Sequence, residues 1–279
     1  MKKKLLVAGG DKRQIFLALS LSCLFDTYIS GIDADGVKID DGDIIYDMAI
    51  LPIPVTKDEK TLFSPLCKDE ILLSEIAEKV KSGGTVFGGN FKGAERIFEE
   101  KGIETTDYLK REELSVMNAV ATAEGAIEIA MRETDETIFG NRILITGFGR
   151  IAKILTRTLV SMGAEVTVCA RKKSDTAWAE IYGANGKDFS ILDEKSDFSI
   201  VFNTVPAMIF TKERLSLLKP SCLIIDLASI PGGVDFSYAE EKGIKTIHAL
   251  SLPGKVAPVT SGKIIAKVIK NILEERGEL

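Results

Sequence analysis

The sequence predicts an α/β protein made of two doubly wound, Rossmann-like domains, joined by long helices with a cleft between them. Short apolar runs alternate with helical patterns along the whole chain, which is typical of parallel sheets covered by helices. The alternation stops near residue 113 and restarts near residue 141. A chain of 279 residues is also about twice a typical domain length.

The first half reads as one sheet with its covering helices. Apolar runs predict strands at residues 5–8, 27–31, 48–52, 85–88 and 103–108, and helical spacing predicts helices over 11–24, 69–81 and 91–101. Ser82-Gly83-Gly84 is a stop signal for the second of these helices. Pro52 and Pro54 predict a stiff loop after the third strand.

The second half repeats this alternation between two long helices. Strands are predicted at 142–146, 165–169, 197–203, 222–227 and 244–248, and long helices at 113–134 and 260–276. We therefore expect an N-terminal substrate domain over 1–115, a bridging helix over 116–139, a nucleotide-binding domain over 140–256, and a C-terminal helix over 257–279 that packs back on the first domain.

Composition excludes several classes of function. Lys and Arg number 36 against 41 Asp and Glu, a net charge of −5 that offers no broad basic field for nucleic acid or an anionic membrane. No apolar run approaches a membrane span, so we expect a cytoplasmic protein. The four cysteines lack Cys-x-x-Cys spacing and His248 is the only histidine, so no metal site is expected.

The most informative segment is a strand, a Gly-x-Gly-x-x-Ala turn and a helix. Gly147 permits a tight turn, Gly149 lets the backbone approach a pyrophosphate, and Ala152 lets the helix pack on the strand. The first backbone N–H groups of the helix and its dipole favour a phosphate. The expected dinucleotide contacts here are Gly147, Phe148, Gly149, Arg150 and Ile151.

The end of the next strand favours NADP (NADPH) over NAD. NAD enzymes place a carboxylate there for the ribose hydroxyls, but this chain has Arg171 and Lys172, which would attract a 2′-phosphate. The alternative is a solvated basic loop.

Later strand ends complete the expected cofactor site. Asn203, Thr204 and Pro206 lie where a turn can cover the cofactor's ribose, and Ala228 and Ser229 lie near the expected nicotinamide. Asp226 precedes them, and its alternative role is to cap a neighbouring turn. His248 ends a strand on the cleft side, either as a proton carrier or as a hydrogen-bonded structural residue.

Two segments are candidates for binding a carboxylate substrate. Residues 252–262 read as a shaped loop with Lys255, followed by a helix that Thr260 or Ser261 would cap; plain capping with a solvent-facing lysine is the alternative. The first strand-to-helix turn carries Gly10, Asp11 and Arg13 but lacks a dinucleotide fingerprint, so a small carboxylate on Arg13 is favoured.

The bridging helix adds a polar stripe. Asn118, Thr122 and Gly125 fall on one face, which would offer hydrogen bonds if it lines the cleft and would have no role if it faces solvent.

In their residues and their order, these segments resemble those of the dipicolinate synthase A subunits from spore-forming bacteria. The resemblance covers essentially the whole chain, and its most specific segments are Asp226-Leu227-Ala228-Ser229-Ile230-Pro231-Gly232-Gly233 and Leu252-Pro253-Gly254-Lys255-Val256-Ala257-Pro258. The other matching segments are Gly9-Gly10-Asp11 with Arg13-Gln14, Asn118 with Thr122, Glu124 and Gly125, Gly147-Phe148-Gly149-Arg150, and Asn203-Thr204-Val205-Pro206.

The resemblance implies an NADP-dependent oxidation of a dihydrodipicolinate-type compound of the lysine and diaminopimelate route to pyridine-2,6-dicarboxylate. It also implies a flavoprotein-like partner, the B subunit of dipicolinate synthase, and work in the mother-cell cytoplasm during sporulation. For that reaction we assign one carboxylate to Arg13 with the Gly9–Asp11 turn and the other to Lys255 with Thr260. The same reaction leaves Asn118, Thr122 and Ser229 to orient the ring.

Two alternatives stay open. A methylenetetrahydrofolate-dehydrogenase-like or other two-domain NADP oxidoreductase shares the layout, and the Pro253–Pro258 segment echoes a folate-enzyme loop. The 2-hydroxyacid dehydrogenases are disfavoured because Ala228-Ser229-Ile230-Pro231 offers no arginine after the fifth strand. The other alternative is a non-catalytic NADP-binding subunit.

Overall fold

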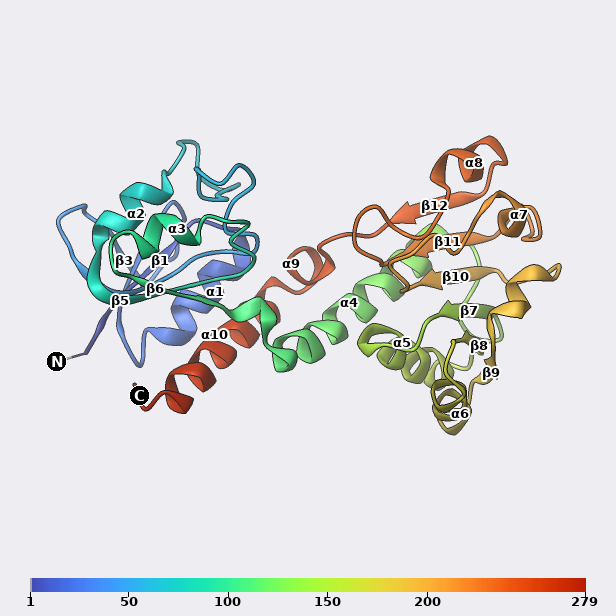
Figure 1. Cartoon of the computed structure of the whole chain (residues 1–279). Helices are drawn as coiled ribbons and strands as arrows, with labels where there is room; N and C mark the ends of the chain where they lie inside the picture. The colour runs from blue at the N-terminus through green and yellow to red at the C-terminus, as the bar shows by residue number, and fades with distance from the viewer. Residues whose placement is uncertain (1) are drawn as a thin grey trace. The chain divides into compact units, whose positions relative to one another are not determined.

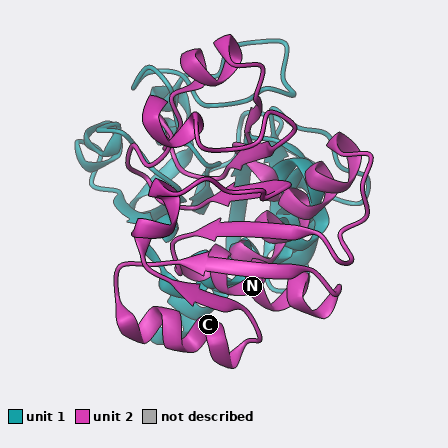
Figure 2. Cartoon of the chain, turned by 90° about the vertical axis from the view of Figure 1, so that its right-hand side faces the viewer, with its two compact units in different colours: residues 1–118, 254–279 teal, residues 119–253 magenta. Residues whose placement is uncertain are grey.

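A computed structural model describes residues 2–279 and divides the chain into two compact units. Unit 1 combines the chain up to Asn118 with Gly254–Leu279, and unit 2 is Ala119–Pro253 (Figure 2). Each unit has one six-stranded sheet, and all the strand pairs are parallel. The predicted fold class of two doubly wound α/β sheets is confirmed.

The sheet of unit 1 has the strand order β3-β2-β1-β4-β5-β6. Its strands are β1 (Lys4–Ala8), β2 (Asp26–Ser30), β3 (Lys38–Ile39), β4 (Tyr46–Ile50), β5 (Val80–Gly88) and β6 (Glu104–Asp107). From β1 the chain winds outward through β2 to β3, and then returns to place β4 on the other side of β1. Figure 1 labels β1, β3, β5 and β6 of this sheet. The carboxyl ends of β1 and β4 therefore form a topological switch point, where open α/β sheets bind ligands.

Helices from both ends of the chain cover this sheet. They are α1 (Lys12–Leu21), α2 (Leu73–Lys79), α3 (Glu95–Glu99), the short η1 (Tyr108–Lys110) and α10 (Pro258–Glu275). The buried face of α10 joins the core formed by α1, β1 and β4. Helices α10 and α1 pack closely because Gly262 has no side chain: a Cβ there would lie 2.4 Å from the carbonyl oxygen of Arg13.

The sheet of unit 2 has the order β12-β11-β10-β7-β8-β9, which is the same winding. Its strands are β7 (Arg142–Thr146), β8 (Glu165–Cys169), β9 (Asn185–Lys187), β10 (Ile200–Asn203), β11 (Leu223–Asp226) and β12 (Lys245–His248). The helices are α5 (Arg150–Ser161), α6 (Lys173–Ile181), η2 (Phe189–Asp193), α7 (Lys212–Leu215) and α8 (Phe236–Glu241). Here the switch point lies between β7 and β10.

Two further helices belong to neither unit alone. Helix α4 (Glu112–Glu133) begins in unit 1 and continues into unit 2, and α9 (Leu252–Val256) begins in unit 2 and ends in unit 1. Helix α4 is long and apolar enough to cross a membrane by length and composition alone. Half of its most apolar window is buried inside the protein, as in the core helix of a globular fold.

Several predicted boundaries are wrong, for local reasons. Helix α2 ends at Lys79, and Ser82-Gly83-Gly84 lies inside β5, where Gly83 adopts a φ of +74°. Residues 252–256 form α9 instead of an irregular loop. The predicted cap at Thr260 or Ser261 is also wrong, because Ala257 is the N-cap of α10 and Pro258 starts the helix. Proline suits that position, since its missing N–H has no partner in a first turn.

Candidate nucleotide and carboxylate sites

The turn between β7 and α5 has the geometry of a phosphate cradle. Gly147 has a φ of +86°, and a Cβ on it would lie 2.7 Å from the Thr204 hydroxyl oxygen, so only glycine suits this position. Gly149 is the N-cap of α5, with no side-chain cap and no atom within 4 Å of the place a Cβ would take. The open space and the uncapped helix start fit the pyrophosphate of a dinucleotide.

The other residues of this turn divide into buried and exposed groups. The Phe148 side chain is buried in the core of unit 2, 5.9 Å from the ring of Tyr182, so its contribution to a cofactor site would come from its backbone. Ile151 also packs against this core, whereas the Arg150 side chain is exposed.

A buried polar network joins the ends of β7, β10 and β11. Asn203 accepts a hydrogen bond from the Thr146 hydroxyl at 2.6 Å and donates one to Asp226 at 2.8 Å. Asp226 is fully buried and accepts hydrogen bonds from the backbone N–H groups of Ala228 and Gly233, at 3.0 and 2.7 Å. Asn203 and Asp226 therefore shape the two loops beside the switch point. Thr204 is half-buried and donates its hydroxyl to the Thr146 carbonyl oxygen at 2.7 Å, and Pro206 is exposed.

His248 supports the same loop. Its Nε2 lies 2.8 Å from the Ala228 carbonyl oxygen, which requires Nε2–H to donate, and its ring stacks on Phe236 with centroids 5.3 Å apart. These contacts fit the structural role for His248. Ser229, next to Ala228, is exposed.

The basic segment after β8 splits into two roles. Arg171 is exposed and lines a cavity of about 480 Å³ within unit 2. Lys172 is the N-cap residue of α6, and it is not among the described residues that line this cavity.

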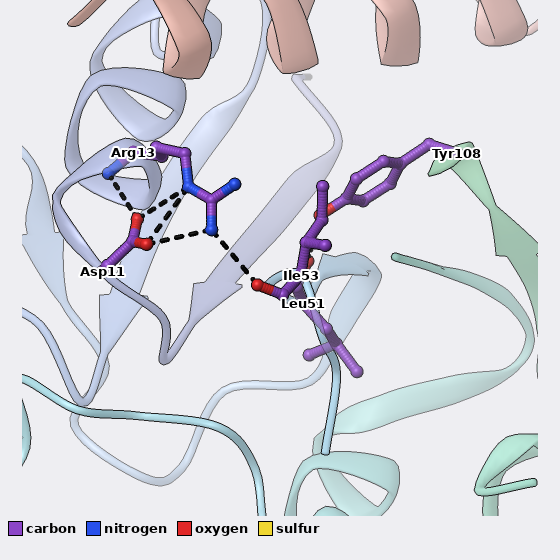
Figure 3. A network of polar contacts seen from close by, with 5 residues as sticks. All are labelled: Asp11, Arg13, Leu51, Ile53 and Tyr108. Atoms are coloured by element: carbon purple, nitrogen blue, oxygen red, sulfur yellow. Dashed lines mark hydrogen bonds and ion pairs between the residues drawn. The ribbon is translucent and has the colours of Figure 1, made fainter. Parts of the chain in front are cut away.

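The equivalent turn of unit 1, between β1 and α1, holds an internal ion pair (Figure 3). Asp11 caps α1 by accepting the backbone N–H of Arg13 at 3.0 Å. Arg13 Nε donates to both Asp11 carboxylate oxygens, at 2.9 and 3.2 Å, and Nη2 donates to Oδ2 at 2.9 Å. Nη2 also donates to the Ile53 carbonyl oxygen at 3.1 Å, so this arginine spans the switch point between β1 and β4.

Tyr108 completes the buried side of this network. It is fully buried and donates its hydroxyl to the Leu51 carbonyl oxygen at 2.7 Å, which fixes the end of β4 (Figure 3). Burial raises the pKa of Tyr108, so the phenol stays protonated as a donor.

The structure brings the second predicted carboxylate segment to the same place. A Cβ on Gly254 would lie 3.0 Å from both Arg13 Nε and Asp11 Oδ2, so the α9 backbone lies directly against the ion pair. Lys255 follows Gly254 in the chain and is exposed, and Thr260 lies exposed in the first turn of α10. Unit 1 therefore gathers Arg13, Asp11 and the start of α10 at one edge of its sheet.

The polar stripe on α4 is less informative. Asn118 and Thr122 are both half-buried and lie one turn apart, with Asn118 in unit 1 and Thr122 in unit 2. Among residues 2–279, no group of three or more His, Cys, Asp or Glu side chains is placed to hold a metal ion.

Sequence reasoning missed three contributors to these sites. The Ile53 carbonyl and Gly254 contact Arg13 through packing that no sequence pattern signals. Arg214 lines the same cavity as Arg171, although Arg214 lies on α7 and Arg171 lies in the loop after β8. The Asp11–Arg13 pair did have a signal, since an aspartate at an N-cap with a nearby arginine favours such a contact.

Together, a second parallel sheet with an open Gly-x-Gly turn and a preceding unit of the same winding define a two-domain, dehydrogenase-type protein. Residues 112–229 match the D-isomer specific 2-hydroxyacid dehydrogenase, NAD binding domain, and residues 4–109 match the N-terminal domain of the dipicolinate synthase A subunit. The chain is 33% identical to the dipicolinate synthase A subunit of Bacillus subtilis (strain 168), over 98% of this chain and 96% of that protein. It belongs to the dipicolinate synthase A-subunit family.

Solved structures agree. The dipicolinate synthase A chain from Bacillus subtilis matches with a TM-score of 0.88 and 33% identity, over 100% of this chain and 98% of that one. The dipicolinate synthase A subunit from Bacillus halodurans gives a TM-score of 0.88 and 30% identity, over 97% of each chain. Transhydrogenase from Sinorhizobium meliloti covers 99% of this chain and 95% of its own, with a TM-score of 0.74 at 15% identity, which shows a shared fold alone.

Proposed function

We propose that this protein is an NADP-dependent oxidoreductase that converts a dihydrodipicolinate-type intermediate into pyridine-2,6-dicarboxylate. The observation that carries the proposal is membership of the dipicolinate synthase A-subunit family over nearly the whole chain. The open glycine turn of unit 2 supports the cofactor, because its geometry and uncapped helix suit a pyrophosphate.

The cofactor would lie along the carboxyl edge of the unit 2 sheet. The turn at Gly147 and Gly149 would hold its pyrophosphate, Arg171 its ribose phosphate, and the loops at Thr204 and Ala228 its nicotinamide half. When bound, the nicotinamide supplies a hydride acceptor. The buried Asn203–Asp226 hydrogen bond keeps both loops in place, so the protein's task there is to position and not to react.

The substrate carboxylates would bind at the edge of unit 1. The positive charge of Arg13 and the starts of α1 and α10 lie together, and Asp11 is the acidic group that Arg13 holds there. The two N–H groups of Arg13 Nη1 are left for a ligand once the bonds of Nε and Nη2 are counted. Lys255 and Thr260 would bind the second carboxylate, and Asn118, Thr122 and Ser229 would orient the ring. The proton would pass to water, because formation of the aromatic ring favours its loss.

The name of the B. subtilis relative describes one kind of subunit, which implies a partner for that protein. We propose that this chain likewise acts with a flavoprotein-like B subunit, in the mother-cell cytoplasm of a sporulating bacterium. The folate alternative is weakened, because Pro253–Pro258 forms α9 and the start of α10 where that hypothesis needs a loop.

The direct test measures absorbance at 340 nm with NADP⁺ and a mixture that generates dihydrodipicolinate. We expect absorbance to rise and pyridine-2,6-dicarboxylate to accumulate, with the chain alone or with its partner present. NADP⁺ that binds but is never reduced, even with the partner, would favour the non-catalytic alternative.

A further inference from the structure

One cavity of unit 2 combines apolar walls with two arginines. It has a volume of about 480 Å³, within the range of small-molecule sites. Phe189, Val205, Pro206 and Ile209 supply apolar surface, and Arg171 and Arg214 supply positive charge. This composition suits a flat apolar ring that carries an anionic substituent.

The sheet order places this cavity beside the glycine turn. Arg171 follows β8, and the loop at Val205–Ile209 follows β10. Strand β7, which leads into the Gly147–Gly149 turn, lies between β8 and β10. A nucleoside attached to a pyrophosphate at that turn would therefore extend into this cavity.

Arg214 is held in place from two sides. Its Nε donates to Asp193 Oδ1 at 2.9 Å, and its Nη1 donates to the Ile209 carbonyl oxygen at 3.0 Å. Its side chain is only 24% exposed. Three of the five guanidinium N–H groups remain for a ligand, and the fixed plane reduces the entropy lost on binding.

The positive charge of Arg214 also affects the end of strand β8. Burial raises the pKa of Cys169 to about 12, and the positive charge of Arg214 partly opposes this rise. Arg171, which follows β8, and Arg214 line the same cavity, so both positive charges can act on one ligand there.

We propose that Arg214 and Arg171 together select a 2′-phosphorylated adenosine, with Arg214 taking the part that the sequence assigned to Lys172. Asp193 is a positioning residue that holds the Arg214 guanidinium. This inference rests on the proposed function only for the dinucleotide, because it concerns binding and not the oxidised substrate.

The test compares adenosine 2′,5′-bisphosphate with adenosine 5′-monophosphate, which differ only in the 2′-phosphate. Calorimetric titration of the full chain should give tighter binding of the bisphosphate. Arg214→Gln should weaken binding of the bisphosphate by about 10-fold or more, the size of one lost charge-assisted hydrogen bond. The affinity for the monophosphate should change by less than about 2-fold.

Lys212→Gln is the matched control. Lys212 lies two residues before Arg214 on α7, where its Nζ is 5.7 Å from the Tyr238 ring centroid. Its substitution should leave the affinity for both ligands unchanged. An unchanged thermal melting curve for Arg214→Gln would show that the variant is folded.

Three results would overturn the proposal. They are equal binding of both ligands by the wild type, an Arg214→Gln variant with unchanged affinity for the bisphosphate, and equal weakening of both ligands. Binding as expected without any oxidation of dihydrodipicolinate would instead remove the proposed reaction and leave this inference standing.

Discussion

The β1–α1 turn of unit 1 and the β7–α5 turn of unit 2 occupy the same place in two sheets of the same winding. Each has three residues between strand and helix, residues 9–11 and 147–149. They differ at the N-cap, where unit 1 has Asp11 and unit 2 has Gly149. Asp11 places its own carboxylate at the start of α1, whereas Gly149 leaves that position open in α5.

The third residue of the helix also differs between the two units, and again unit 1 has the larger, polar side chain. Ala152 in α5 is fully buried and small, whereas Gln14 in α1 is 1% exposed and fills space beside Gly10. The Gln14 Nε2 group is buried without a hydrogen-bond partner among the described residues. The same sheet topology thus carries two kinds of helix start. The start of α5 is open and suits the phosphate of a ligand, whereas the start of α1 already holds the Asp11 carboxylate, which keeps Arg13 in place.

The largest effect should follow from giving unit 2 the N-cap of unit 1. Gly149→Asp would set a carboxylate against the pyrophosphate, and such like-charge contacts cost several kcal/mol. We expect NADP⁺ binding to weaken by about 100-fold or more in calorimetric titration. Gly149→Ala is the comparison: its Cβ meets no protein atom within 4 Å, so its effect on NADP⁺ binding measures the methyl group alone, and the additional loss in Gly149→Asp measures the charge. Equal loss in both variants would show that charge at the N-cap is not the reason.

A second substitution tests the backbone of the unit 2 turn. Gly147→Ala forces a Cβ into a φ of +86° and to within 2.7 Å of the Thr204 hydroxyl oxygen, so we expect stability to fall by about 1–3 kcal/mol. Denaturant unfolding measures this loss. Gly140→Ala is the comparison, because Gly140 has a φ of +73° but nothing within 4 Å of the Cβ position. A Gly140→Ala loss of the same size would assign the whole effect to φ.

The unit 1 turn is tested through its arginine. Arg13→Ala should raise KM for the dihydropyridine dicarboxylate by about 10-fold, one lost charge-assisted contact, with little change in NADP⁺ affinity. Steady-state kinetics at saturating NADP⁺ measure it. Lys12→Ala, an exposed cation at the start of the same helix, should leave KM unchanged. Unchanged KM for Arg13→Ala would remove unit 1 from substrate binding.

The smallest effect should come from Asp11, whose carboxylate competes with a ligand for the Arg13 guanidinium. Asp11→Asn keeps an N-cap side chain, because asparagine caps as well as aspartate, but removes the negative charge beside Arg13. We expect KM for the dicarboxylate to fall by a few-fold, because the ligand no longer competes with Asp11 for the guanidinium. A higher KM would mean that Asp11 mainly orients Arg13.

Local signals in the sequence predicted much of this arrangement. The Gly147-x-Gly149-x-x-Ala152 pattern is readable because each residue type answers a backbone demand within one turn. The two sheets follow from alternating apolar runs, although the short edge strands β3 and β9 carry too few apolar residues to be recognised.

Long-range packing could not be predicted in the same way. The sequence predicts Arg13 as a cation for a ligand, but it does not predict that the Ile53 carbonyl oxygen and the Gly254 backbone lie against its guanidinium. Arg214 carries no motif, and only the return of the chain after β10 places it in the same cavity as Arg171. Partners brought together by topology leave no trace in residue spacing.

Helix α10 has a consequence for biosynthesis. It completes the core of unit 1 beside α1, yet the ribosome makes it only after the whole of unit 2. During translation, the apolar face of α1 would stay exposed to solvent until α10 is made, although all the strands of unit 2 would already be present. Unit 2 begins later in the chain than unit 1 but is completed first, and a nascent chain stopped at Pro253 would expose the apolar surface of unit 1 that α10 covers.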